Sequence, residues 1–486
     1  MKNETILQGF EWYLPADSQH WNRLSKKAEE LSDLGITAVW MPPAYKGSAG
    51  VNDVGYGTYD LYDLGEFDQK NTVPTKYGTK EEYLQSIQAL KKFNMKVYAD
   101  IVFDHFMGAD EEETVQAVAY SFDDRTKPIS DEKEIKAWTK FTFPGRDGKY
   151  NTYQWHWQNF SGVDYDARNK DHAIFNFANK GWEPAVDDEN GNFDYLMGCN
   201  LDMENPETVE QLDQWGKWYQ TLTGVDGYRL DAVKHIRFDL FVNWLLHRRE
   251  EKQEELFVVG EYWSDELDKL HEYLDSSGNL ISLFDVPLHF NLYQAANSMG
   301  NFDMREIFAG TLIETRPDWS VTFVDNHDTQ KGQSLESWVE GWFKGHAYAL
   351  TLLRNEGKPV VFWGDLYGSE NVEPVGDSLT TMIKLRKQLT FGNQADYFDD
   401  ANIIGWTCTG DFEEEFSGMA VIMTNAGGGE KMMTISAIHQ GETFVDILGN
   451  NDTKVILDDN GQGVFPVNDG QVSVYINEKL VKQLDQ

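Results

Sequence analysis

The 486-residue sequence has little cysteine, little positive charge and no long apolar run. With only Cys199 and Cys408, no disulfide framework is expected, and a cysteine-based zinc site is excluded by count. No stretch is apolar for long enough to span a membrane. Its 42 Lys and Arg face 81 Asp and Glu, which gives a formal net charge of −39. Such a surface repels phosphate backbones and anionic lipid, so no nucleic-acid or membrane role is expected. The charge fits either a neutral substrate or simple solubility.

A signal peptide is also lacking at the N-terminus. Met1 to Thr5 leads directly into an apolar run, without an h-region and a cleavage site. We therefore expect a cytoplasmic protein; the alternative is a secreted mature form that carries an added start codon.

Aromatic residues, in contrast, are abundant, with 16 Trp, 22 Tyr and 28 Phe. Sugar rings present flat C–H faces that pack on aromatic side chains, so this excess indicates either a carbohydrate ligand or a core rich in aromatics.

Short apolar runs alternate with amphipathic segments over most of the chain. The runs are nearly continuous in apolar residues, as expected for strands of a parallel sheet that is buried on both faces. Together they predict an α/β fold, a (β/α)8 TIM barrel. The predicted strands are Ile6–Trp12, Ile36–Met41, Lys96–Phe103, Gly224–Leu230, Leu256–Glu261, Leu280–Val286, Ser320–Val324 and Pro359–Trp363, and the predicted helices are Trp21–Leu34, Lys80–Phe93, Val209–Thr223, Phe238–Arg249 and Gly341–Asn355.

Two further parts depart from the barrel pattern. About a hundred residues separate the third strand from the next helix, which is too long for a βα loop and predicts an inserted β-rich subdomain. Near the C-terminus, alternating segments between Gly, Asn and Asp turns predict an antiparallel β-sandwich. The predicted division is a barrel of residues 1–103 and 205–392, an insertion of 104–204 and a sandwich of 393–486.

Carboxylates stand at or just after the ends of three of the predicted strands: Asp231, Glu261 and Asp328. Acids at the ends of buried strands cost desolvation energy, so each needs a partner or a function. In a barrel, the carboxyl ends of the strands meet at one mouth. Cleavage of a glycosidic bond with retention needs one carboxylate as an acid and a second as a nucleophile, which this placement provides. Structural ion pairs are the alternative for each residue taken singly.

The segments around these acids resemble the four signature regions of the α-amylase family of retaining α-glucan hydrolases and transglycosylases. They occur in the family's order, and the strand pattern, the insertion and the sandwich agree with it over essentially the whole chain. The four segments are Asp100–His105, Asp226–His235, Gly260–Trp263 and Phe323–Asp328.

The resemblance implies a role for each matching position. Asp231 corresponds to the nucleophile, Glu261 to the general acid/base and Asp328 to the stabiliser of the transition state. Arg229 corresponds to the arginine that holds the nucleophile ionised, and Asp100 to an acid that supports this arginine. His105 and His327 correspond to histidines that hydrogen-bond the sugar at the cleavage point.

Four more residues match substrate-binding positions of the family. Lys234 and His235 correspond to a pair on the side that binds the reducing end; a solvent-facing pair at a helix start is the alternative. Tyr56 and Trp263 correspond to aromatic platforms for glucose rings, with core packing as the alternative for Tyr56.

Two N-terminal segments, Gln8–Tyr13 and Trp40–Pro43, resemble the bacterial liquefying and intracellular α-amylases. This implies hydrolysis of internal α-1,4 bonds of starch, glycogen or maltodextrins with retention of configuration, and we expect the protein to be a monomer. A transglycosylase of the same family is the main alternative, and a non-catalytic carbohydrate-binding protein is a second one.

The resemblance also implies one structural Ca2+ between barrel and insertion. Its matching ligands are Asp104, Asp194, Asn200 and the backbone carbonyl of His235, and oxygen ligands suit this ion. At a neighbouring cluster of the family that binds further metal ions, one ligand is lost and two are longer by a methylene, so we expect no second metal there. An acidic loop that binds nothing is the alternative for the region. The altered cluster reads Ser161, Glu183, Asp202 and Glu204.

Overall fold

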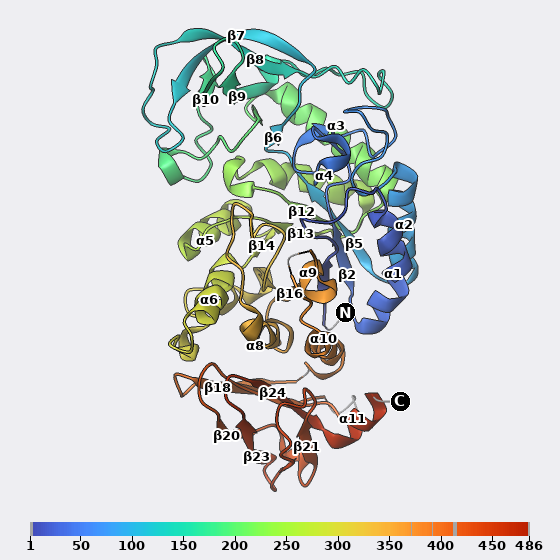
Figure 1. Ribbon diagram of the computed structural model, residues 1–486, viewed down its shortest axis with the longest axis vertical. Helices are drawn as coiled ribbons and strands as arrows, with labels where there is room; N and C mark the ends of the chain where they lie inside the picture. The colour runs from blue at the N-terminus through green and yellow to red at the C-terminus, as the bar shows by residue number, and fades with distance from the viewer. Residues whose placement is uncertain (1–2, 371, 391, 412–415, 485–486) are drawn as a thin grey trace. The chain divides into compact units, whose positions relative to one another are not determined.

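The computed structural model describes residues 3–370, 372–390, 392–411 and 416–484 (Figure 1). The chain divides into two compact units. One consists of Met1–Tyr13, Glu30–Ala38 and Phe284–Gln486, and the other of Leu14–Glu29 and Val39–Leu283. The three-part division expected from the sequence stays a prediction; its outer limits, residues 1 and 486, and residue 391 near its last boundary lie outside the described residues.

The eight predicted barrel strands are all confirmed as a closed barrel, in the order β1, β16, β15, β14, β13, β12, β5, β2. Their side chains are almost entirely buried, as in Ala38–Met41, because both faces of the sheet are covered. Most strands are shorter than predicted, since the chain turns into loops at the polar residues that follow. Their bounds are β1 (Ile6–Gln8), β2 (Ala38–Met41), β5 (Lys96–Ile101), β12 (Gly227–Leu230), β13 (Phe257–Gly260), β14 (Ser282–Phe284), β15 (Ser320–Phe323) and β16 (Lys358–Phe362).

The five predicted helices are confirmed within a few residues at their ends. Helix α2 begins with a capping box, in which Thr79 and Glu82 exchange hydrogen bonds between side chains and backbone. Helix α3 begins with Pro206 after the cap Asn205 and ends at Gly224, whose φ of 60° closes the helix. The helices are α1 (His20–Leu34), α2 (Lys80–Lys92), α3 (Pro206–Thr223), α4 (Leu240–Lys252), α5 (Leu267–Ser276), α6 (Val286–Asn297), α7 (Leu312–Thr315), α8 (Gly341–Leu352), α9 (Trp363–Tyr367), α10 (Asp377–Leu389) and α11 (Glu478–Leu484).

The inserted segment forms its own six-stranded sheet, in the order β6, β11, β9, β10, β7, β8 (Figure 1). Burial alternates along β8, so one face of this sheet packs and the other meets solvent. The predicted β-rich insertion is therefore confirmed. Its strands are β6 (His105–Phe106), β7 (Glu111–Tyr120), β8 (Lys133–Lys140), β9 (Phe160–Asp166), β10 (Asp171–Phe177) and β11 (Cys199–Leu201); a separate ribbon pairs β3 (Lys46–Gly47) with β4 (Thr58–Asp60).

The C-terminal strands form two antiparallel sheets, as predicted. A six-stranded sheet has the order β17, β18, β19, β24, β21, β22, and a second sheet pairs β20 with β23. Both contribute to one apolar core, for example Ile422 from β19, Met433 from β20 and Phe465 from β23. The strands are β17 (Gln394–Tyr397), β18 (Ile403–Cys408), β19 (Met419–Thr424), β20 (Gly429–Thr434), β21 (Thr443–Asp446), β22 (Val455–Ile456), β23 (Gln462–Val467) and β24 (Val472–Asn477).

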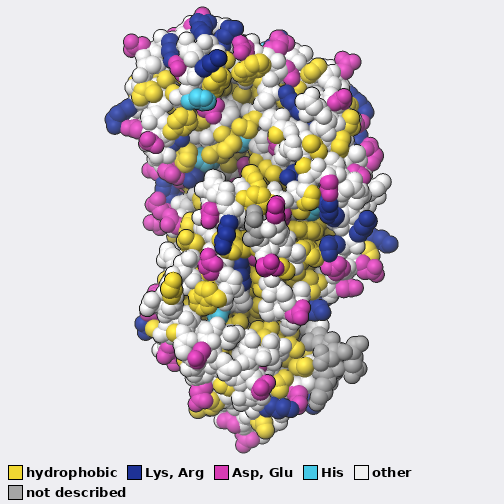
Figure 2. Space-filling view, viewed as in Figure 1, with side chains coloured by type: hydrophobic (Ala, Val, Ile, Leu, Met, Phe, Trp, Pro, Cys, Tyr) yellow, Lys and Arg dark blue, Asp and Glu magenta, His cyan; other side chains and the backbone are white. Residues whose placement is uncertain are grey.

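The surface reflects the acidic composition. On the face shown in Figure 2, Asp and Glu side chains are spread among Lys and Arg and do not gather in one patch. Among the helices that the structure describes, none is both long enough and apolar enough to cross a membrane.

Candidate active site

One arginine organises the carboxyl ends of three neighbouring strands. Arg229 on β12 pairs in register with Asp100 on β5, so both side chains lie on the same face of the sheet. The buried guanidinium donates through Nη1 to Asp100 Oδ1 at 2.9 Å and to Asp231 Oδ1 at 2.5 Å, and through Nη2 to Glu261 Oε2 at 2.6 Å. A single planar donor thus binds the predicted nucleophile, the predicted acid/base and the predicted supporting acid.

The surroundings keep this arginine charged. Burial opposes its charge, but Asp100, Glu261 and Asp231 outweigh burial and hold the Arg229 pKa well above its ordinary value. Burial raises the pKa of Asp100 to about 6, although Arg229 acts to lower it. Trp40 Nε1 and the Tyr56 hydroxyl each donate to Asp100 Oδ2 at 2.9 Å. Their rings lie 5.2 and 5.6 Å from the guanidinium, within cation–π range.

The two acids that directly follow β12 and β13 remain partly accessible to solvent. About a tenth of each side chain is exposed, 11% for Asp231 and 10% for Glu261. Within the described part of the chain, Asp231 Oδ2 makes no hydrogen bond, so it is available for attack. The Ala232 N–H donates to Glu261 Oε2 at 3.1 Å, and Ala232 adopts the left-handed conformation, with φ of 51°, to do so. A left-handed non-glycine residue costs of order 1 kcal/mol and is typical of functional sites.

His105 and Tyr56 are held by protein groups in this structure. His105 Nδ1 lies 2.9 Å from Asp104 Oδ2, and its Nε2 lies 2.9 Å from the Tyr56 carbonyl oxygen. Burial acts to lower the His105 pKa, but the hydrogen bond to Asp104 and the charge of Asp104 outweigh it and the pKa is raised. The predicted sugar contact of His105 therefore requires exchange of one of these hydrogen bonds. For Tyr56, the hydroxyl braces Asp100 while the ring stays half-buried.

Lys234 and His235 follow the nucleophile in a short 3-10 turn. Lys234 Nζ donates to Glu189 Oε2 at 2.7 Å and to the Trp263 carbonyl at 3.0 Å. His235 Nδ1 lies 2.7 Å from the Phe193 carbonyl oxygen. Burial, with the nearby Lys234 charge, lowers the pKa of His235 to about 3, so this ring stays neutral. The ring of Trp263 is half-buried.

Asp328 and His327 follow β15 in the other compact unit. Gln8 Nε2 donates to His327 Nδ1 at 2.9 Å, which leaves the proton of a neutral ring on Nε2. This Nε2 lies 3.1 Å from Asp328 Oδ2, and 19% of the Asp328 side chain is exposed. The Trp12 ring stacks on His327 with centroids 6.1 Å apart. Neighbouring groups thus hold His327 in place, and the Asp328 carboxylate remains partly open to solvent.

The predicted calcium ligands line one narrow cavity, which lies beside the turn that carries His235. Asp104, Asp194, Asn200 and His235 all border it, together with the altered cluster of Ser161, Glu183, Asp202 and Glu204. The structure therefore brings every predicted metal-site residue together. Within the described ranges, however, no group of three or more His, Cys, Asp or Glu side chains has the geometry of a formed metal site.

Several oxygens in this cavity lack a partner. Buried Asp104 Oδ1, Asn200 Oδ1 and Glu183 Oε2 accept no hydrogen bond from the described residues. Asn200 turns its nitrogen to Ser161 Oγ at 2.8 Å and to Asp194 Oδ1 at 3.0 Å, which leaves its oxygen over. Burial raises the pKa of Asp104 to about 6 and that of Asp194 to about 7. Buried oxygens without donors are the groups that a hard cation satisfies.

At the altered cluster, an ammonium group is already present. Lys180 Nζ lies 2.5 Å from Asp202 Oδ2 and donates to the Gln158 carbonyl at 2.7 Å. Ser161 Oγ is used by Asn200. The predicted calcium ligands therefore include buried oxygens without a hydrogen-bond donor, whereas in the altered cluster the Asp202 carboxylate is paired with Lys180.

Two residues of the site were not predicted from the sequence. Trp40 stood out only as part of a subgroup motif, although its indole N–H anchors Asp100. Ala232 could not be predicted, because an alanine in the sequence does not indicate a left-handed backbone conformation.

A closed parallel barrel whose strand ends hold two accessible carboxylates on one arginine has the architecture of an enzyme that cleaves glycosidic bonds. Comparison with known proteins agrees: residues 20–407 match the model of the α-amylase catalytic domain. The chain belongs to the α-amylase family of glycoside hydrolases.

Three relatives illustrate the match. The chain is 49% identical to an α-amylase of Geobacillus stearothermophilus, over 98% of this chain and 87% of that protein. It is 42% identical to the cytoplasmic α-amylase of Escherichia coli (strain K12), over 99% of this chain and all of that protein (100%). Among solved structures, an α-amylase from Geobacillus thermoleovorans complexed with acarbose superposes with a TM-score of 0.64 at 17% identity, covering 98% of each chain, which supports the fold.

Proposed function

We propose that this enzyme is an α-amylase that hydrolyses internal α-1,4 bonds of an α-glucan with retention of configuration. The observation that carries the proposal is the Arg229 guanidinium, which holds Asp231 and Glu261 side by side at the ends of adjacent strands. Family membership supplies the substrate class, and the geometry supplies the two carboxylates that the chemistry needs.

The proposed reaction has two displacements. Glu261 gives its proton to the glycosidic oxygen while an oxygen of Asp231 attacks the anomeric carbon, so that the leaving sugar departs and an ester forms. Glu261 then takes a proton from water, which attacks the same carbon and releases Asp231. Arg229 keeps Asp231 ionised throughout. Asp328 is proposed to stabilise the positive charge that develops on the sugar ring.

The other predicted residues are proposed to bind the glucan. His105 and His327 hydrogen-bond the sugar at the cleavage point, and Trp263 and Tyr56 offer aromatic faces to glucose rings. Lys234 and His235 lie on the side of the reducing end; the fixed contact of Lys234 to the Trp263 carbonyl supports a common position for the two residues.

One Ca2+ is proposed in the cavity between barrel and insertion, with Asp104, Asp194, Asn200 and the His235 carbonyl as ligands. The unpartnered Asp104 and Asn200 oxygens support this set. When bound, the ion neutralises buried carboxylates and ties the insertion to the turn after Asp231. The lysine at Asp202 supports the absence of a second ion.

For organisation and location, we propose a monomer with a barrel of residues 1–103 and 205–392, an insertion of 104–204 and a sandwich of 393–486. The cytoplasm is the proposed compartment, supported by the Escherichia coli relative whose name places it there. A secreted mature form is the alternative.

Digestion of maltoheptaose, followed by NMR during the first minutes, tests the activity. The expected products are shorter maltooligosaccharides with the new reducing end in the α form. A β first product would refute the double displacement, and products longer than maltoheptaose would show transglycosylation instead.

A further inference from the structure

A second recess lies in the compact unit that carries Asp231, and it is lined by none of the residues assigned a role above. Its volume is about 920 Å3. It is bordered by Tyr62, by residues of the 148–156 loop and by Gln211, Gln214 and Trp218 of α3. This is the size of a pocket that holds several linked small rings.

The chemistry of the recess differs from that of the rest of the surface. A quarter of the chain (25%) is charged, yet no Asp, Glu, Lys or Arg lines this recess. Its walls consist mainly of aromatic rings and neutral amides, together with Thr152 and with His156, whose Nδ1 lies 3.1 Å from Glu113 Oε1. The amides and hydroxyl groups offer hydrogen-bond donors and acceptors without charge, which suits a neutral ligand rich in hydroxyl groups. The amides are Asn151, Gln154, Gln211 and Gln214, and the rings include Tyr62, Tyr150, Tyr153 and Trp218.

The aromatic wall is centred on Trp218. Its ring contacts those of Tyr62 and Tyr150 in tilted arrangements, with centroid separations of 4.9 and 5.1 Å. These contacts hold the half-buried indole in one orientation before any ligand arrives. Within the described part of the chain, its N–H makes no hydrogen bond. Trp218 therefore presents both a fixed apolar face and an available donor.

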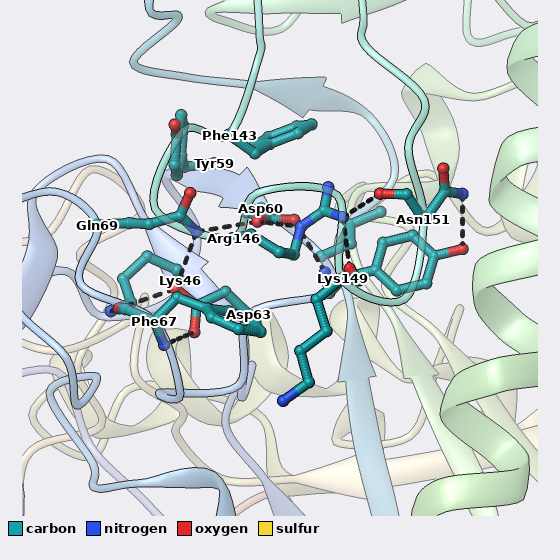
Figure 3. Close-up of polar contacts among 12 residues, drawn as sticks. Lys46, Tyr59, Asp60, Asp63, Phe67, Gln69, Phe143, Arg146, Lys149 and Asn151 are labelled. Atoms are coloured by element: carbon teal, nitrogen blue, oxygen red, sulfur yellow. Dashed lines mark hydrogen bonds and ion pairs between the residues drawn. The ribbon is translucent and has the colours of Figure 1, made fainter.

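A buried ion pair fixes the 148–156 loop of the recess (Figure 3). Arg146 Nε donates to Asp60 Oδ2 at 2.8 Å, and its Nη1 donates to the carbonyl oxygens of Lys149 (2.8 Å) and Asn151. Gln69 Nε2 donates to the same Asp60 oxygen at 2.9 Å. These charge-assisted hydrogen bonds of Arg146 hold the loop in place.

Asn151 then joins the loop to the other walls. Its Nδ2 donates to the Tyr62 hydroxyl at 3.2 Å and to Gln211 Oε1 at 3.0 Å. Its Oδ1 accepts from the Tyr153 N–H at 2.6 Å. In contrast, the Thr152 hydroxyl and the exposed Gln154 amide make no hydrogen bond to any described residue. The walls of the recess are thus joined by hydrogen bonds through Asn151, while the polar groups of Thr152 and Gln154 remain available to a ligand.

We propose that this recess is a second, non-catalytic binding site for an α-glucan segment. A glucose ring stacks on Trp218, and its hydroxyl groups bind the Trp218 N–H, Gln154 and Thr152. The inference rests on the proposed function, since it takes the enzyme's own substrate as the ligand. A site of this kind holds a long polymer on the enzyme while the barrel cleaves it.

Calorimetric titration of the Glu261→Gln variant with maltoheptaose tests the proposal, because this variant is expected to bind the ligand while cleaving it at least about a hundredfold more slowly than the wild type. Two binding events are expected. Adding Trp218→Ala should remove the second event, or weaken it at least about tenfold, the equivalent of 1.4 kcal/mol, and keep the first. Trp342→Ala, which removes another partly exposed tryptophan (43% exposed) from helix α8, is the matched control and should keep both.

A second variant covers the case in which Trp218→Ala does not fold. Gln154→Ala combined with Gln214→Ala removes two surface amides without touching the aromatic packing, and it should also weaken the second event. A single binding event in Glu261→Gln, with normal hydrolysis by the wild type, would refute the second site alone. Failure of the wild type to cleave maltoheptaose would contradict the proposed function instead.

Discussion

Replacing Glu261 with Gln changes a proton donor and leaves the shape of the site almost unaltered. Glu261 Oε2 accepts from Arg229 Nη2 at 2.6 Å and from the Ala232 N–H at 3.1 Å. The amide oxygen of a glutamine can accept both hydrogen bonds. Arg229 also keeps Asp231 and Asp100 as partners, so the nucleophile should keep its orientation.

The expected loss follows from the missing proton transfer. General acid–base catalysis contributes about 10²–10⁴-fold, which corresponds to roughly 3–5.5 kcal/mol of activation free energy. We expect kcat on maltoheptaose to fall by this factor, with KM little changed, because the groups that bind sugar are intact.

A substrate with a better leaving group separates acid catalysis from a structural defect. In α-maltosyl fluoride, the departing fluoride needs no strong acid, so formation of the Asp231 ester should be much less impaired in Glu261→Gln. Burst kinetics measure that step. Glu250→Gln, on the exposed face of α4, is the matched control and should behave as the wild type. Near-normal hydrolysis of maltoheptaose by Glu261→Gln would refute the assignment, and so would an equal loss on both substrates.

Three further predictions concern the charges of the molecule. Arg229→Lys replaces a planar donor that binds three carboxylates with a single ammonium, so kcat/KM should fall by about a hundredfold or more, at about 1.5–3 kcal/mol per lost charge-assisted bond; wild-type kinetics would contradict the bridging role. Elemental analysis after exhaustive dialysis should find one calcium per chain, and two or more ions would contradict the proposed single-ion site. Removal of the ion by a chelator or by Asp104→Ala should lower the Tm. Burial lowers the pKa of His289 to about 4 in the fold, so its stabilising contribution is complete above the ordinary value near 6.5 and is lost as the pH falls toward 4, up to about 3 kcal/mol. Thermal unfolding between pH 7 and pH 4 should show this loss, and it should be smaller in His289→Gln; the same slope in both proteins would exclude His289 as its source.

The barrel could be predicted because its strands are apolar on both faces, a pattern that few other segments share. The helix that follows β14 shows where this signal fails. The apolar run Leu280–Val286 contains both the strand, which ends at Phe284, and the start of α6 at Val286. Asp285 separates them: its side chain accepts from the Leu288 N–H and caps the helix. Helix α6 is itself largely buried, so no polar face marks it in the sequence.

At the site, the residue types could be predicted but their contacts could not. Tyr56 illustrates the difference. The sequence suggests an aromatic platform, whereas the structure uses its hydroxyl to hold Asp100. That contact depends on how the loop before β4 folds over the barrel strand, which no local pattern encodes. The pairing of Arg229 with Asp100 depends on the register between β12 and β5, which is also a property of the sheet rather than of either segment.

Arg229 explains how three acids can share one buried site. With Asp100, Asp231 and Glu261 all ionised, one guanidinium would face three negative charges. Burial raises the pKa of Asp100 to about 6, Arg229 acts to lower it, and the charge of Asp231 acts to raise it further. A proton on Asp100 would therefore relieve this repulsion, while the guanidinium still binds Asp231 through Nη1 at 2.5 Å and Glu261 through Nη2 at 2.6 Å. A retaining glycosidase needs a nucleophile and an acid side by side, and a single shared arginine places both.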